Sequence, residues 1–196
     1  MSKVAWRAGN MLYPLPAVMV TTLDQEGKPN ILTVAWAGTV CSDPAMVSIS
    51  VRPSRYSYQA LKERGEFVIN LVSKDLTGAM DTCGVKSGKN VDKFAECQLH
   101  PEASRFVEVP GIAESPVCIE CRVKQIIPLG SHDLFIAEVL GVNVEERLMQ
   151  EDGRFALEKA SLVAYNHGEY RALGEKLGSF GYSVRKKKKK KAVKKC

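Results

Sequence analysis

Short runs that alternate apolar and polar residues recur along the chain and predict a mostly β structure. Residues 17–23 and 30–36 are rich in Val, Ile and Thr, and the turn between them contains Gly27, which tolerates positive φ. The two runs therefore predict a β-hairpin. Further strands are predicted over residues 45–51, 66–72, 117–127 and 133–144, with a turn at 128–132 between the last two.

Helical segments are predicted to be short and few. Ser54 is a candidate N-cap for a helix over residues 55–64, which Gly65 would end. The other expectations are a short helix capped by Asp75 and reaching Met80, a loop over 81–90 and a short helix over 91–96. Residues 154–182 carry a mixed pattern and predict no single element.

Five or six long strands in hairpin order, with one helix between two of them, indicate an antiparallel barrel of Greek-key type. A doubly wound parallel sheet would need a helix after nearly every strand. The fold class predicted is therefore mostly β with short helices. At 196 residues, we expect one domain over 1–184 and a lysine-rich tail over 185–196.

The net charge of +6 comes from this tail, which holds one Arg and eight Lys. Without these nine charges, 19 basic and 22 acidic residues remain, so the rest of the chain is close to −3. We therefore expect no specific nucleic-acid partner. The lysine run itself is interpreted as a solvated, disordered appendage, or alternatively as a weak tether to polyanions.

The six cysteines predict free thiols rather than a disulfide framework. No signal peptide and no apolar run of membrane-spanning length is found, so a cytoplasmic protein without membrane insertion is expected. Cys118 and Cys121 have the spacing of a redox motif but fall in a predicted strand. There they would point to opposite faces, which favours buried structural thiols. The histidines His100, His132 and His167 are scattered, so no metal site is predicted.

A cluster of hydroxyls and guanidinium groups follows the strand at 45–51. Its members are Ser50, Arg52, Ser54, Arg55 and Ser57. Arginine presents paired N–H donors that match phosphate oxygens, so the cluster predicts a phosphate site, with solvated surface charge as the alternative. Gly84 to Lys89 superficially resembles a nucleotide-binding P-loop, but only three residues separate its glycines and Asn90 replaces the Ser or Thr.

Several short motifs occur together in one order along the chain. They are Pro14-x-Pro16, Gly27-Lys-Pro-Asn30, Ala35-Trp36, Ser42-Asp-Pro44, Ser48-Ile-Ser50, Phe67-Val-Ile-Asn70, and Gly130-Ser-His132 followed by the strand to Val139. In this order they resemble the flavin reductase-like family, over roughly residues 12–170. Cys83-Gly-Val-Lys-Ser-Gly88 and Val91-Asp-Lys-Phe94 are similar to its flavoredoxin branch.

The resemblance implies an FMN-binding split barrel, non-covalent FMN, a homodimer and electron transfer through the flavin. Reductases of the family commonly carry Gly-Asp-His where this chain has Gly130-Ser-His132, so the electron donor is left open between NAD(P)H and a redox protein. Two alternatives remain: a flavin-binding carrier or sensor without turnover, and a split barrel that binds another cofactor, such as haem or pyridoxal phosphate.

The candidate cofactor site combines these segments. The small residues around Trp36 would let a flat ring approach a strand edge whose backbone N–H groups are donors, although a core Trp is an alternative. The loop after Cys83 would fold over the flavin, with Lys86 or Lys93 near it, and His132 would lie beside the flavin or its reductant. The candidate cofactor-binding residues are Ala35, Trp36, Ala37, Thr39, Ser50, Arg52, Ser54, Arg55, Ser57, Cys83, Gly84, Lys86, Lys93 and His132. No catalytic acid or base is assigned.

Overall fold

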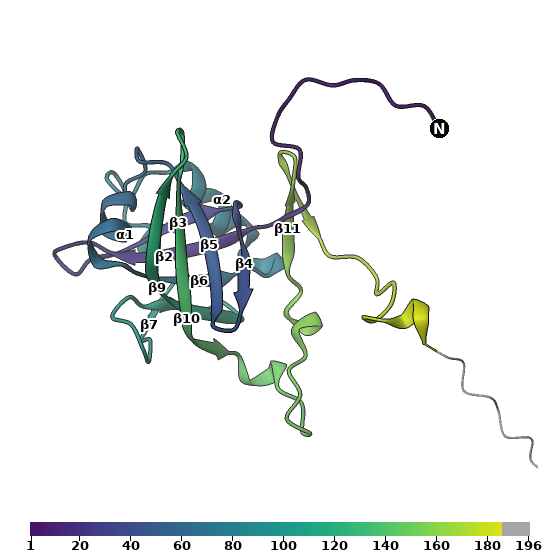
Figure 1. The fold of residues 1–196 in the computed structure, drawn as a ribbon. Helices are drawn as coiled ribbons and strands as arrows, with labels where there is room; N and C mark the ends of the chain where they lie inside the picture. The colour runs from purple at the N-terminus through teal and green to yellow at the C-terminus, as the bar shows by residue number, and fades with distance from the viewer. Residues whose placement is uncertain (186–196) are drawn as a thin grey trace, which may run out of the picture.

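The computed structural model describes residues 1–185 and contains a seven-stranded antiparallel sheet in the order β3-β2-β6-β9-β10-β5-β4 (Figure 1). Its strands are β2 (Val18–Leu23), β3 (Pro29–Val34), β4 (Ala37–Ser42), β5 (Ala45–Val51), β6 (Glu66–Leu71), β9 (Val117–Pro128) and β10 (Asp133–Val144). Every pairing in this sheet is antiparallel, which confirms the predicted fold class. The predicted hairpins at 17–36 and 117–144 are also confirmed, and Gly27 has the expected positive φ.

The sheet curls so that its inner face encloses one apolar core. Val20 of β2, Ile49 of β5, Phe67 of β6 and Phe135 of β10 all contribute to it and are buried. The two sides of the sheet meet just past the end of β3, where the backbone N–H of Ser50 donates to the carbonyl oxygen of Trp36 at 2.9 Å. This contact brings residues that follow β3 next to residues of β5.

Three short helices pack on the sheet: α1 (Tyr58–Arg64), α2 (Thr77–Val85) and α3 (Lys93–Glu96). Helix α1 contributes Leu61 to the barrel core. A second apolar core lies between α2, α3 and the outer face of the sheet, and includes Met19, Ile31, Met80 and Phe94. Both faces of β2 are therefore buried, which explains why its sequence is almost continuously apolar.

Three sequence-based expectations about helices were wrong. Helix α1 begins at Tyr58 rather than Arg55, and Ser54 does not cap it; residues 52–57 form turns instead. Asp75 lies inside a 3₁₀ turn (Lys74–Leu76) that leads directly into α2. Helix α2 then continues to Val85, which is inside the segment 81–90 that was expected to be a loop. The loop is therefore confined to residues 86–92. The helix end at Gly65, with φ of 67°, is as predicted.

The sequence did not predict strand β4, because its side chains are mostly exposed and Gly38 has none. No alternation of apolar and polar residues therefore marks it. It forms the sheet edge beyond β5. The C-terminal part forms a small sheet of β1 (Leu15–Pro16), β11 (Val163–Asn166) and β12 (Glu169–Ala172). A two-stranded sheet pairs β7 (Pro101–Glu102) with β8 (Gly111–Ile112). Residues 1–13 and the segment after β12 extend away from the main sheet in Figure 1.

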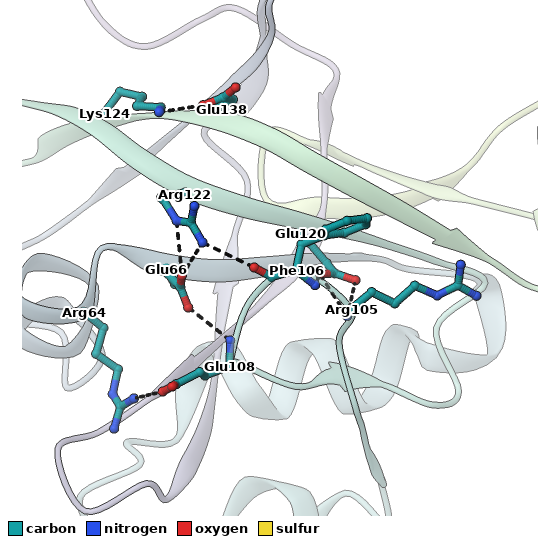
Figure 2. A network of polar contacts seen from close by, with 9 residues as sticks. All are labelled: Arg64, Glu66, Arg105, Phe106, Glu108, Glu120, Arg122, Lys124 and Glu138. Atoms are coloured by element: carbon teal, nitrogen blue, oxygen red, sulfur yellow. Dashed lines mark hydrogen bonds and ion pairs between the residues drawn. The ribbon is translucent and has the colours of Figure 1, made fainter.

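Cys118 and Cys121 point to opposite faces of β9, as predicted: Cys121 lies in the barrel core and Cys118 in a separate cluster with Val68. Both thiols are buried. Between them, the buried carboxylate of Glu120 accepts hydrogen bonds from the backbone N–H groups of Arg105 and Phe106 (Figure 2). This contact fixes the loop before β8 to the sheet.

Among residues 1–185, no helix is both long and apolar enough to cross a bilayer. The lysine-rich tail predicted over 185–196 lies outside the described residues except for Arg185.

Candidate functional site

Two adjoining cavities form a groove between β3, the end of β5 and the loop after α2. One has a volume of about 220 Å³ and is lined by residues of β3 and β5 together with Trp36, His132 and Tyr165. The other, of about 350 Å³, is lined by turn residues 54–57 and by residues 83–93. Leu32, Arg52 and Arg55 line both cavities, so they mark the junction between the two ends of the groove.

Arg52 and Arg55 form the cationic part of the groove. Neither guanidinium makes a hydrogen bond or an ion pair with any residue between 1 and 185, whereas Arg64 and Arg122 each pair with a glutamate. Both are exposed, so they keep their solvation while remaining available to an anion. Two unpaired, adjacent guanidinium groups suit a phosphate group.

The serines near these arginines differ in their roles. Ser57 is buried, and its hydroxyl oxygen accepts hydrogen bonds from Asn30 Nδ2 at 2.6 Å and Thr22 Oγ1 at 3.1 Å. Its contacts therefore hold the turn against the β2–β3 hairpin. Ser54 is exposed and lines the wider cavity, and Ser50 lines the narrower one.

Lys93 is buried beneath the groove, and its ammonium group donates to the carbonyl oxygens of Ile31 and Cys83 at 2.6 Å each. Burial lowers the pKa of Lys93, and the positive charge of Arg55 lowers it further, while the nearby thiols of Cys83 and Cys97 act in the opposite direction. Lys93 thus ties α2 to the edge strand as well as lining the cavity.

Lys86 and Gly88 place the loop after α2 along the groove. Lys86 pairs with Glu96 of α3, and both side chains are partly exposed. A Cβ added to Gly88 would meet the side chain of Asn30 and come within 2.8 Å of Tyr56 Cδ1, so only glycine fits there without displacing a neighbour. Gly84 does not line either cavity; it packs on Thr33 of β3, where an added Cβ would lie 3.1 Å from the Thr33 Cβ.

The outer edge of β3 supplies backbone groups to the narrower cavity. β3 pairs only with β2, and the Ile31 carbonyl points away from β2 because it accepts from Lys93. Backbone groups alternate along an antiparallel edge strand, so Thr33, two residues later, presents its N–H and carbonyl to the same outer side. Thr33 and Ala35 line the cavity, which gives a flat ligand an edge of donors and acceptors.

An aromatic pair, Trp36 and His132, lines the narrower cavity. The rings of Trp36 and His132 have centroids 4.5 Å apart. Burial lowers the pKa of His132, and the charges of Arg52 and Arg55 lower it further, so the neutral imidazole is favoured. Its Nδ1 lies 2.9 Å from Ser131 Oγ. Trp36 does not take the core position that was the alternative, since its side chain is partly exposed.

Most of the predicted site residues meet in this groove. Those that line it are Ala35, Trp36, Ser50, Arg52, Ser54, Arg55, Ser57, Cys83, Lys86, Lys93 and His132. Ala37 and Thr39 lie on β4: Ala37 lines a separate apolar cavity of about 680 Å³ beside residues 9–13, and Thr39 is exposed. Gly84 is also outside, as described above.

The sequence did not single out several residues that line the groove. These are Asn30, Leu32, Thr33, Val34, Val51, Tyr56, Ser87 and Gly88. Asn30 and Gly88 stood within motifs used for the family resemblance, so a motif-by-motif reading could have included them. For Tyr165 the sequence leaves a core and a ring-stacking position equally open; it lies on β11, far away in sequence, and lines the narrower cavity.

Comparisons with known proteins show which sequences and structures this chain resembles. The model of the flavin reductase like domain matches residues 10–174. The structure of flavoredoxin from Desulfovibrio vulgaris (Miyazaki F) superposes with a TM-score of 0.87 at 34% identity, covering 94% of this chain and 100% of that one. Nitrilotriacetate monooxygenase component B from Bacillus cereus gives a TM-score of 0.78 at 26% identity, with coverage of 86% and 88%.

Among proteins with a named activity, an NADH:riboflavin 5'-phosphate oxidoreductase from Streptomyces pristinaespiralis is 26% identical over 132 residues. That match covers 67% of this chain and 70% of the relative. These similarities confirm the predicted family resemblance and the split-barrel fold.

Proposed function

The chain belongs to the flavin reductase-like family, and from this premise we propose that it is an oxidoreductase that holds FMN non-covalently. The observation that carries the proposal is the groove itself. The wider cavity, up to its junction with the narrower one, has two guanidinium groups that pair with no residue between 1 and 185, and the narrower cavity has the outer edge of β3 beside the aromatic rings of Trp36, His132 and Tyr165. A flat ring with a phosphorylated chain matches both ends, because each end offers the chemistry that one part of FMN needs.

In this proposal, Arg52, Arg55 and Ser54 hold the phosphate, with Lys86 adding positive charge at the same end. The backbone of Thr33 and Ala35 receives the polar edge of the ring, and Leu32 forms an apolar floor between the two ends. Thr39 and Gly84 are left out of the site, and Lys93 acts through its contacts with Ile31 and Cys83.

When bound, FMN supplies the redox chemistry, either hydride acceptance or electron transfer. The protein's own groups bind and orient it. Positive charge near the ring and the N–H donors along β3 would favour a reduced, anionic ring and so raise its potential. The lowered pKa of His132 favours its neutral form, which is a poor proton donor, and no general acid or base is assigned to the reaction.

Two modes of use differ in how FMN is retained. In one, FMN exchanges as a substrate and NAD(P)H reduces it, as the name of the Streptomyces relative states for that protein. In the other, FMN stays bound and electrons pass to or from a redox protein. We favour the second, because the flavoredoxin is the relative with the higher identity over almost the whole chain. A cytoplasmic location is part of the proposal, since the five cysteines between residues 1 and 185 are free thiols.

A homodimer is also proposed, with the second copy completing the groove. The two ends of the described chain carry exposed apolar side chains, including Trp6, Leu12, Leu177 and Phe180. An apolar cavity beside residues 9–13 reaches Trp36 and Ser50, which also line the groove. Apolar surface of this kind is stabilised by a partner, and a second copy is the partner always present.

The absorption spectrum of the purified protein tests the proposal. We expect a yellow protein with flavin bands from which acid releases FMN, not FAD. Adding NADH without oxygen then separates the two modes. Bleaching of the flavin bands by NADH supports NADH as the donor. Bands that NADH leaves unchanged, but that a reduced redox protein bleaches, support electron transfer between proteins. A colourless protein that also fails to bind added FMN would contradict the proposal, and a Soret band or a lysine–aldehyde adduct would identify haem or pyridoxal phosphate instead.

A further inference from the structure

Two thiols lie next to each other beneath the wider cavity. Cys83 is in the last turn of α2, Cys97 ends α3, and their Sγ atoms are 3.8 Å apart. A disulfide needs about 2.05 Å between sulfurs, so the pair is within a small side-chain movement of bonding. Among residues 1–185, no other pair of cysteines is in contact; Cys118 and Cys121 face opposite sides of β9.

The two thiols differ in access. Cys83 is fully buried, and burial raises its pKa to about 12 with a smaller contribution from Cys97, whereas Cys97 is only partly buried. An oxidant in solution therefore meets Cys97 first. Lys93 donates to the Cys83 carbonyl, which places an ammonium charge beside the pair and stabilises negative charge that forms there.

Residues between the two cysteines form one wall of the groove. Lys86, Ser87 and Gly88 line the wider cavity, and the Lys86–Glu96 pair lies on the solvent side of the same segment. The segment is anchored at Gly88, on Asn30 and Tyr56, and at Lys93. A bond between Cys83 and Cys97 would close segment 84–96 into a loop and limit its opening.

We propose that Cys83 and Cys97 are a dithiol–disulfide pair that locks segment 84–96 along the groove when oxidised. A small disulfide such as oxidised glutathione is the oxidant. The Cys97 thiolate attacks one of its sulfurs and releases one glutathione thiolate; the Cys83 sulfur then attacks Cys97 Sγ and releases the second. The two thiol protons leave with the two released thiolates, so the protein loses two electrons and the glutathione disulfide gains them.

Peptide mapping of the full-length protein after equilibration with oxidised glutathione tests the bond. Trypsin under non-reducing conditions should give the peptide from Asp75 to Lys86 joined to that from Phe94 to Arg105, two hydrogens lighter than their sum. Cys97→Ser should abolish the joined peptide, and the control Cys121→Ser should keep it. Absence of the joined peptide in a wild-type protein that keeps its circular dichroism spectrum, or its persistence in Cys97→Ser, would overturn the proposal.

Hydrogen exchange tests the lock without depending on flavin. Oxidation should slow exchange of the amides in residues 86–92 by about tenfold while leaving those of β9 unchanged. Unchanged exchange in a verified disulfide form would refute the lock. The consequence for the cofactor rests on the proposed function: release of FMN from the oxidised protein should be slower by about threefold or more. Failure to bind FMN at all would count against the proposed function and leave the peptide and exchange results standing.

Discussion

The indole ring of Trp36 and the imidazole ring of His132 lie with centroids 4.5 Å apart and planes inclined by 41°. Trp36 follows β3 and His132 precedes β10, so the contact joins two turns that are almost a hundred residues apart. Both rings line the groove beside Arg52 and Arg55. The charges of those arginines therefore act on the imidazole directly, and this coupling can be measured.

Removing Arg52 should raise the pKa of His132 toward its ordinary value. Burial is the larger cause of the lowered pKa and remains in the variant, so the recovery should be partial. Titration of the imidazole resonances of wild type and Arg52→Ala by NMR measures the change, with Arg171→Ala, an exposed arginine paired with Glu169, as the control. An identical titration in Arg52→Ala would mean that the guanidinium does not act on this ring.

Arg52→Ala or Arg55→Ala should weaken FMN binding and spare riboflavin binding. A charge-assisted contact to phosphate contributes about 1.5–3 kcal/mol, or roughly 10–100-fold in affinity, and riboflavin has no phosphate. Fluorescence titration with both ligands gives the two affinities. Arg147→Ala is a matched control outside the groove, where Arg147 pairs with Glu145. Equal losses for FMN and riboflavin would assign the arginines a structural role.

Holoprotein at micromolar concentration should sediment as a homodimer. The exposed apolar residues at the two ends are expected to be covered in it, so replacing Trp6 and Phe180 by Ser should shift the equilibrium toward monomer and lower FMN affinity together. A monomeric wild-type protein that binds FMN fully would contradict both the dimer and its part in the site.

The sequence predicted those parts of the fold in which one face of each strand is buried. β5 was predicted with its observed bounds, and β9 and β10 to within one residue, because each alternates against the barrel core. The sequence predicted neither β4 nor the full length of α2. β4 is an exposed edge strand, and α2 carries Gly78 in its first turn and Gly84 in its last turn, which lowers local helix propensity. Packing of α2 on β3 decides its extent.

The candidate site was predicted best where residues that are close in sequence also form one part of the site. Arg52, Ser54 and Arg55 follow one strand and line one cavity. The role of Lys93 could not be predicted, since its two acceptor carbonyls belong to Ile31 and Cys83, and only the packing of α3 against β3 brings them together. Tyr165 reaches the groove from the C-terminal sheet for the same reason.

Glu120→Gln should destabilise the fold by about 2–3 kcal/mol, because an amide NH₂ group would face backbone N–H donors in a buried position. Burial raises the pKa of Glu120, but hydrogen bonds from Arg105, Phe106 and Asn143 outweigh it, so the pKa is lowered overall. The stabilisation is thus fully present above about pH 4.3, since about 4.3 is the ordinary pKa of glutamate in an unfolded chain. It is lost as the pH falls through the lower pKa that Glu120 has in the folded protein.

Urea unfolding of the wild type and Glu120→Gln at neutral and acid pH measures this difference. The exposed Lys124–Glu138 pair in Figure 2 supplies the control, and Glu138→Gln should change stability by less than about 1 kcal/mol. The gap between wild type and Glu120→Gln should narrow as the pH falls. If the stability difference stays constant down to pH values well below the pKa of free glutamate, the charge of Glu120 is not what stabilises the loop.

Gly88→Ala should weaken FMN binding more than it destabilises the fold. The added methyl group would meet Asn30 and come within 2.8 Å of Tyr56 Cδ1, so the loop along the phosphate end of the groove must move outward. The first turn of α2 offers a matched control: a Cβ at Gly78 meets nothing within 4 Å, so Gly78→Ala should leave FMN affinity unchanged and leave stability equal or slightly higher. Fluorescence titration with FMN and thermal unfolding of the apoproteins separate the two effects. Equal FMN affinities for the two variants would mean that the loop after α2 does not contact the cofactor, and the wider cavity would then have no part in holding it.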